Sequence, residues 1–156
     1  MRRILEIVAR VAVIVLILLP VLFYPQLPQQ IPIHFDAAGR PDAYGDRSLI
    51  WWLPAIGTVL YAGLSLLGRL PPAARPPRQA SGRAAAIRYH DGKHLLQYLK
   101  AITLLLFAYL TTAKISIALR WSIGLGTAFT GFCLLAVGGL LAYYSSRWIR
   151  AGQRTE

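Results

Sequence analysis

The chain has 156 residues, of which 56% are hydrophobic and 15% are charged, whereas soluble domains usually have about 25% charged residues. This composition predicts one compact unit in a membrane. The net charge of +11 would suit nucleic acid, but the sequence has neither aromatic interleaving nor a recognised binding fold, so we expect no nucleic-acid partner. The single cysteine, Cys133, excludes an intramolecular disulfide and a zinc site built from cysteines.

The apolar residues gather in four blocks of about 20 residues or more, which is the length that crosses a bilayer as a helix. The expected spans cover approximately residues 4–24, 49–68, 99–119 and 122–144. The sequence therefore predicts an all-α, multi-pass membrane protein with four transmembrane helices. Residues 1–156 would form a single polytopic membrane domain.

The basic residues predict how these helices are oriented. Thirteen of the 17 Lys and Arg residues lie before or early in the first span, between the second and third, or after the fourth. The positive-inside rule then places both termini in the cytoplasm (N-in and C-in) and the loop 25–48 outside. The first span starts like a signal peptide, but no pair of small residues follows its apolar core, so we interpret it as an uncleaved anchor.

The extracytoplasmic loop 25–48 is predicted to be structured. Pro28 and Pro32 favour extended backbone in the residues that precede them. Gly39 and Gly45 permit a positive φ, which predicts a turn at each. The loop also contains three of the six acidic residues of the chain. This pattern favours a compact cap over a flexible linker.

Two features of the helices are expected to be structural. Glu6 and Arg10 are four residues apart, with the acid first, which is the favourable order for an ion pair on one helix face. Residues 83–98 are expected to form an interfacial helix that runs into the third span, although Gly92 weakens this prediction.

The fourth span carries small residues at helical spacing. Gly124, Gly131 and Gly138 are seven residues apart and would share one face. Such a face favours close packing, either within the chain or between copies, so a homo-oligomer through this helix is one expected partner.

Several polar residues are candidates for ligand binding. His34, Asp36, Asp42 and Asp46 are weak metal candidates, because their spacing fits neither an EF-hand loop nor a zinc helix, and turn formation is favoured. His90 and His94 are four residues apart but have no obvious third ligand. We expect no cofactor. Lys114, deep in the third span, either extends towards the membrane surface or bonds an aspartate of the loop.

The loop also resembles a known family. The order of its residues is similar to that of a bacterial membrane family of unknown function, the domain found at the N-terminus of the SdpI immunity and signalling protein. The resemblance covers residues 20–60. The matching residues are Leu27, Pro28, Ile31, Pro32, His34, Phe35, Gly39, Asp42, Gly45, Arg47 and Pro54. Asp36 stands where the family usually has Asn, and Arg47 where it usually has Lys.

This resemblance implies a bacterial plasma (inner) membrane protein surrounded by the lipid bilayer. The leading hypothesis is a non-enzymatic binding, sensing or immunity-like role of the loop, with a secreted peptide or another membrane protein as partner. A small transporter or channel subunit and a metal-dependent membrane enzyme are the alternatives. The sequence does not favour an enzyme, because it has no nucleophile–base pair of recognisable spacing, no P-loop and no dinucleotide fingerprint.

Overall fold

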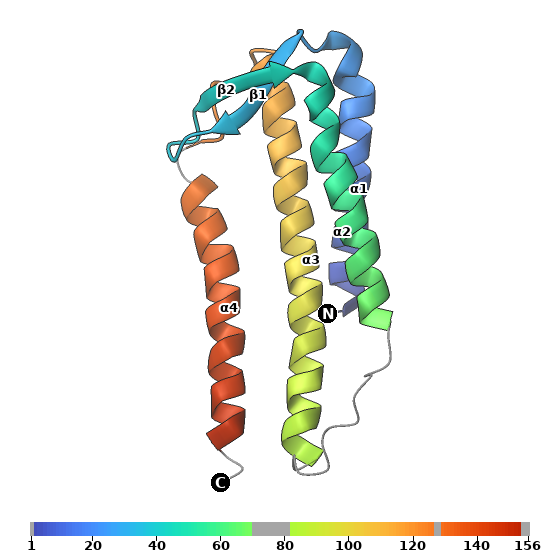
Figure 1. Cartoon of the computed structure of the whole chain (residues 1–156), viewed down its shortest axis with the longest axis vertical. Helices are drawn as coiled ribbons and strands as arrows, with labels where there is room; N and C mark the ends of the chain where they lie inside the picture. The colour runs from blue at the N-terminus through green and yellow to red at the C-terminus, as the bar shows by residue number, and fades with distance from the viewer. Residues whose placement is uncertain (1, 70–81, 127–128, 154–156) are drawn as a thin grey trace.

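A computed structural model describes residues 2–69, 82–126 and 129–153 of the chain. In these residues four helices run lengthwise, and a β-hairpin covers one end of them (Figure 1). The helices are α1 (Arg2–Phe23), α2 (Trp52–Arg69), α3 (Gly82–Ala118) and α4 (Phe129–Gln153). The start of α1 and the end of α4 lie away from the hairpin, and α4 stands beside α3 at one side of the bundle. We call the covered end the hairpin end.

Within the described residues, three helical segments are long and apolar enough to cross a membrane: Arg3–Gln26, Arg47–Gly68 and His94–Ala118. They agree with the first three predicted spans, so the chain has the helices of a membrane protein. The predicted fourth span, 122–144, is not among them. Its start was also predicted wrongly, because α4 begins only at Phe129.

The late start of α4 has a local cause. After α3 ends, Arg120 adopts a left-handed backbone conformation with a φ of 61°, which reverses the chain. Residues 122–126 then run back across the hairpin, where Leu125 is bound by the main chain of Gly39. These residues therefore form a docking loop instead of a first helical turn.

Helix α3 is much longer than a membrane span. Its 37 residues correspond to about 55 Å at a rise of 1.5 Å per residue, against a hydrocarbon core of about 30 Å. The helix continues through Gly92 without interruption, so residues 83–98 are helical and run directly into the span, as predicted.

Close contact between α1, α2 and α3 depends on small residues. Ala9 and Ala12 of α1 are almost fully buried against Leu104 of α3. On α2, a Cβ atom built on Gly57 would overlap Leu16 Cδ2. Because only hydrogen fits there, Gly57 allows α2 to approach α1 closely.

A cluster of polar side chains joins the same three helices far from the hairpin. Glu6 of α1 accepts hydrogen bonds from Lys100 Nζ of α3 at 2.5 Å and from Tyr61 Oη of α2 at 2.9 Å. Lys100 also lies 3.2 Å from Ser65 Oγ of α2. The predicted pair of Glu6 and Arg10 is confirmed, at 3.6 Å. We call Glu6, Tyr61, Ser65 and Lys100 the ion-pair cluster.

Candidate functional site at the hairpin end

The predicted structured loop is a β-hairpin, so the expectation of an all-α chain is wrong here. Strands β1 (Gln30–Phe35) and β2 (Pro41–Asp46) are antiparallel, with Gln30 opposite Asp46 and Phe35 opposite Pro41. Both strands are edges of the two-stranded sheet. Pro32 of β1 and Pro41 of β2 therefore lie on edge strands, where a proline removes no hydrogen bond of a central strand. The pairing is irregular on both sides of His34: β1 has an extra residue before it, Ile33, and β2 has an extra residue after it, Asp42.

The hairpin is fixed to the helices by apolar contacts. Leu27 and Ile31 are buried with Ile50 and with Ile115 of α3, and together they form a hydrophobic cluster. Pro32, a residue of the predicted motif, is also fully buried. The matching residues from Leu27 to Pro32 therefore serve mainly to hold the hairpin on the helices. The matching residues from His34 to Arg47 remain for polar contacts.

One of the two predicted turns is present. Gly39 has a φ of 76°, and Asp36 closes the turn by accepting a hydrogen bond from the Arg40 N–H at Oδ1, at 2.8 Å. Gly45 lies inside β2 instead, without a positive φ, so the prediction of a turn there is wrong. Its role is steric, because an added Cβ would lie 2.9 Å from Leu49 Cδ1.

The tip of the hairpin binds the loop between α3 and α4. Leu125 N–H donates to the Gly39 carbonyl oxygen at 2.8 Å, and Tyr109 Oη donates to the Leu125 carbonyl oxygen at 2.7 Å. A Cβ atom on Gly124 would lie 2.7 Å from the Gly39 carbonyl oxygen, so this contact requires glycine. Main-chain atoms of Gly39 and Leu125 thus join the tip to the loop, and the Tyr109 side chain joins the loop to α3.

The remaining charged residues of the motif make local contacts at the surface. His34 Nδ1 lies 2.6 Å from Asp42 Oδ1, and both side chains are exposed. Asp46 caps the short helical turn Arg47–Trp51, because its Oδ1 accepts from the Ser48 N–H at 2.8 Å. Hydrogen bonds from the Ser48 side chain and main chain lower the pKa of Asp46. The Arg47 guanidinium lies 5.2 Å from the centre of the Tyr24 ring.

These contacts separate the four weak metal candidates. Asp42 is next to His34, whereas Asp36 and Asp46 bind main-chain N–H groups elsewhere. Among the described residues no group of three or more His, Cys, Asp or Glu side chains could hold a metal ion. The side chain of His90 lies outside the described part of the chain, so the pair His90 and His94 stays a prediction.

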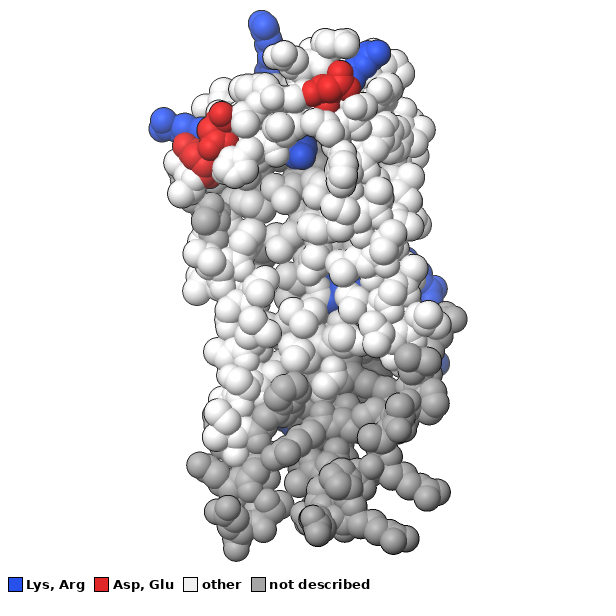
Figure 2. Space-filling view, in the orientation of Figure 1, with Lys and Arg blue, Asp and Glu red and all other residues white. Residues whose placement is uncertain are grey.

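A small pocket lies beneath the hairpin, with a volume of about 440 Å³. We call it the hairpin pocket. Its polar lining comes from His34 and Asp36 of the hairpin and from Lys114 of α3. Its apolar lining includes Leu53, Leu110, Leu125 and Phe129. Figure 2 shows red and blue side chains gathered at the hairpin end, above a mostly white surface on which only some blue side chains are visible.

Lys114 is half-buried in this pocket. None of the ion pairs between described residues includes it, so of the two alternatives given for Lys114 the bond to an aspartate of the loop is not formed. Asp36 nevertheless lines the same pocket. Lys114 and Asp36 therefore lie at one site, but they do not form an ion pair with each other. The structure therefore leaves a lysine and a carboxylate facing a shared space.

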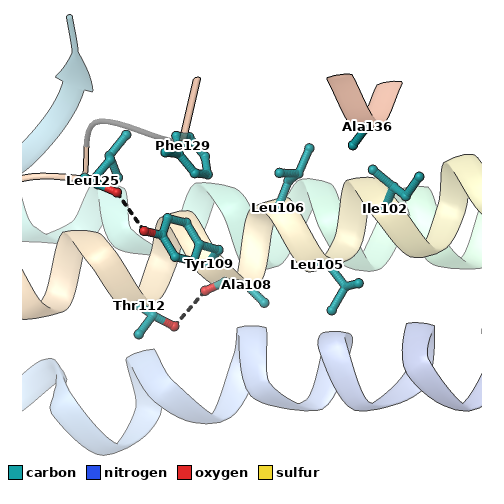
Figure 3. Close-up of a pocket in the computed structure, with 10 residues that line it drawn as sticks. Ile102, Leu105, Leu106, Ala108, Tyr109, Thr112, Leu125, Phe129 and Ala136 are labelled. Atoms are coloured by element: carbon teal, nitrogen blue, oxygen red, sulfur yellow. Dashed lines mark hydrogen bonds between the residues drawn. The ribbon is translucent and has the colours of Figure 1, made fainter. Parts of the chain in front are cut away.

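A larger apolar groove of about 900 Å³ lies between α3 and α4 (Figure 3). Ile102 and Leu106 point from α3 towards Ala136 of α4. Tyr109 stacks on Phe129, with ring centres 4.8 Å apart. Leu125 and Phe129 line both the groove and the hairpin pocket, so the two spaces adjoin. No sequence pattern indicated this groove, because its walls come from residues that look like ordinary lipid-facing positions.

Comparison with known proteins supports the family assignment only for the first part of the chain. Residues 11–58 match the model of a family described as "Domain of unknown function (DUF1648)". The match includes the second half of α1, the hairpin and the start of α2, and so it contains the matching residues recognised in the sequence. The resemblance to the SdpI immunity protein stays a prediction. No solved structure matches the chain.

Two relatives are similar over short segments. An uncharacterised protein of Archaeoglobus fulgidus is 38% identical over 60 residues, which are 38% of this chain and 33% of the relative. The uncharacterised membrane protein YbgB of Bacillus subtilis is 55% identical over 31 residues, which are 20% of this chain and 34% of the relative. The chain thus spans about a third of the length of each relative. The chain is accordingly similar to one uncharacterised protein and to one uncharacterised membrane protein.

Proposed function

We propose that this protein is a non-enzymatic membrane binding protein, which receives a ligand in the hairpin pocket. The observation that carries this proposal is the placement of Lys114 in a pocket of about 440 Å³ with Asp36 and His34. A half-buried cation outside the ion pairs of the described residues is costly in a membrane segment, unless a ligand or the membrane surface solvates it. A pocket with a few polar groups on an apolar wall is the usual form of a ligand site.

The proposal includes the orientation predicted from the basic residues, with the hairpin outside a bacterial plasma membrane. A single cysteine at Ala38, in a Cys133→Ala background, should react with a membrane-impermeant thiol reagent in intact cells. A cysteine at Ala80, in the segment between α2 and α3, should react only after lysis. The reverse pattern would place the hairpin in the cytoplasm and the ligand with it.

Photo-crosslinking in living cells tests the binding site itself. A photoreactive amino acid at Ala37, which lines the pocket, should capture a ligand. The matched position is Tyr44, which is 57% exposed on β2 and does not line the pocket. Lys114→Met should reduce capture at Ala37 to a small fraction. Equal capture at both positions, or capture that ignores Lys114→Met, would show that the pocket is not the site.

The resemblance to the SdpI family supports a narrower version, in which the captured partner is a secreted peptide or a membrane protein and the role is immunity-like or sensory. Identification of the captured species separates this version from binding of a lipid. The transporter and metal-enzyme hypotheses stay predictions, with no supporting contact among the described residues.

A further inference from the structure

We infer that the ligand is a phospholipid with a zwitterionic headgroup that carries a primary amine, held with one acyl chain in the groove between α3 and α4. This inference rests on the proposed function, since it names the ligand class of the same pocket. It is carried by three observations: the charges in the hairpin pocket, the continuity of the pocket with the groove, and the length of the combined space.

The charges of the hairpin pocket fit a headgroup with both signs. Lys114 would bind the phosphate as a point charge, and it is not engaged by any acid of the described residues. Asp36 uses Oδ1 to accept from the Arg40 N–H. Its second carboxylate oxygen, Oδ2, suits an ammonium N–H donor. A purely anionic headgroup would instead place its charge against Asp36, and a choline has no N–H to donate.

The pocket continues directly into an apolar space. Leu125 and Phe129 belong to both linings, and the groove beyond them has mostly aliphatic walls (Figure 3). Leu125 is held in place by its bonds to Gly39 and Tyr109, so the junction is fixed by the fold. A molecule with a polar head and an apolar chain would fill both spaces without burying charge against the groove.

The length agrees with a single leaflet. Lys114 and Ile102 are twelve residues apart on α3, which is about 18 Å along the helix. Half of a hydrocarbon core of about 30 Å is about 15 Å. The groove therefore runs from a headgroup position to about the middle of the membrane, in the direction that an acyl chain takes. Any bilayer lipid can enter such a groove, so selectivity depends on the charges in the hairpin pocket.

The test uses the full chain in vesicles that contain equal amounts of phosphatidylethanolamine, phosphatidylglycerol and phosphatidylcholine. Native mass spectrometry of the extracted protein then measures which phospholipid is retained. We expect phosphatidylethanolamine to exceed each of the others by about fivefold or more, the ratio expected for one additional hydrogen-bonded charge pair. Asp36→Asn should bring the ratio to phosphatidylglycerol close to one or below it. Lys114→Met should lower retention of all three.

Asp46→Asn is the matched control, because Asp46 lies on the same hairpin and, like Asp36, accepts a main-chain N–H at Oδ1, but it does not line the pocket, so it should leave the ratios unchanged. Equal retention of the three phospholipids by the wild-type protein would overturn the inference. So would a preference for phosphatidylglycerol, since Asp36 should oppose it. If Lys114→Met fails to fold, the wild-type ratios and Asp36→Asn still decide.

Failure of this inference is distinguishable from failure of the proposed function. If Ala37 crosslinks a peptide or protein in a manner that depends on Lys114, while the lipid ratios stay equal, the pocket is a binding site for another class of ligand. If Ala37 captures nothing above Tyr44 and the lipid ratios are also equal, both proposals are wrong.

Discussion

Helices α1, α2 and α3 are held together differently from α3 and α4. The first three share buried polar contacts, in which Lys100, only 4% exposed, binds Glu6 from a position 94 residues away in the sequence. Helix α4 meets α3 through aromatic pairs, Tyr109 with Phe129 and Tyr98 with Tyr144. Among its glycines, Gly131, Gly138 and Gly139 face open space, because a Cβ atom added to any of them would have no neighbour within 4 Å.

The difference shows how one chain can combine a fixed bundle with an accessible surface. A buried ion pair tolerates little displacement, because separating the charges in a low-dielectric environment costs several kcal/mol. Aromatic and aliphatic contacts are less directional, so α4 can leave a groove along α3 without leaving a polar group unsatisfied. Binding is therefore expected beside α4 and not among the first three helices.

The largest effect should follow from breaking the ion-pair cluster. Lys100→Met leaves Glu6 without its main partner inside a spanning segment, and we expect a loss of about 3 kcal/mol in the free energy of unfolding. Unfolding in a denaturing detergent measures this loss. The double variant Glu6→Gln with Lys100→Met removes both charges. It should recover at least half of the free energy of unfolding that Lys100→Met alone loses. A single variant as stable as the wild type would mean that the cluster does not hold the three helices together.

The next largest effect should come from the contact between the hairpin tip and the loop before α4. Gly124→Ala forces a Cβ against the Gly39 carbonyl oxygen, and we expect a loss of about 1–3 kcal/mol with faster proteolysis of the hairpin. The matched variant is Gly131→Ala, which meets open space in α4 and should be neutral or stabilising by about 0.5–1 kcal/mol.

Gly131→Ala also tests the expected homo-oligomer. If copies of the chain pack through the open glycine face of α4, the added methyl group should shift the oligomeric state in size-exclusion chromatography with light scattering. An unchanged mass, together with unchanged or higher stability, would contradict packing between copies through this face. Helix α4 would then pack only against helices of its own chain.

A smaller effect is expected for the exposed pair at the hairpin surface. His34→Ala should cost between about 0 and 1 kcal/mol, because solvent screens the interaction of His34 with Asp42. The effect should add to that of Lys114→Met, since Lys114 forms no ion pair with the hairpin acids of the described residues. Protease sensitivity of the hairpin measures both. A double variant no worse than the single ones would indicate a direct coupling that the structure lacks.

The smallest effect concerns pH. Because Ser48 lowers the pKa of Asp46, this carboxylate stabilises the fold above its ordinary pKa of about 4, and the contribution is lost as the pH falls through the lowered value. Wild-type protein and Asp46→Asn should therefore differ in hairpin protease sensitivity at pH 7 and become more alike towards pH 3. A difference that grows as the pH falls would show that the cap acts through another group.

Much of this architecture could be predicted from local patterns. Three of the apolar blocks correspond to the first three spans, and the prolines and Gly39 indicated a folded cap. The sequence could not show that Lys100 is buried, because it follows a run of basic residues and its partner lies at the other end of the chain. The role of Gly45 was missed for a similar reason, since its neighbours Leu49 and Ile33 are steric constraints that only the fold brings together.

The candidate site was predicted only in part. His34, Asp36 and Lys114 were chosen from the sequence for their chemistry, and the structure places all three around one pocket. The residues of the apolar walls could not be predicted, because Leu110, Leu125 and Phe129 are of the same residue types as those on any lipid-facing surface. Leu125 in particular was assigned to a helix, whereas its position in a loop is what connects the pocket with the groove.

The bond between Leu125 N–H and the Gly39 carbonyl oxygen has a consequence for how such proteins diverge. A main-chain donor is available from every residue except proline, so the segment that receives the hairpin tip need not keep a particular side chain, provided that the approach remains unobstructed. The contact at the tip can thus persist while the side chains of the receiving loop change, as long as the third helix keeps an apolar residue at the place of Ile115. A chimera that joins residues 1–69 to other later helices should retain a closed tip if those helices supply this apolar residue and the receiving loop offers one small residue followed by a free amide.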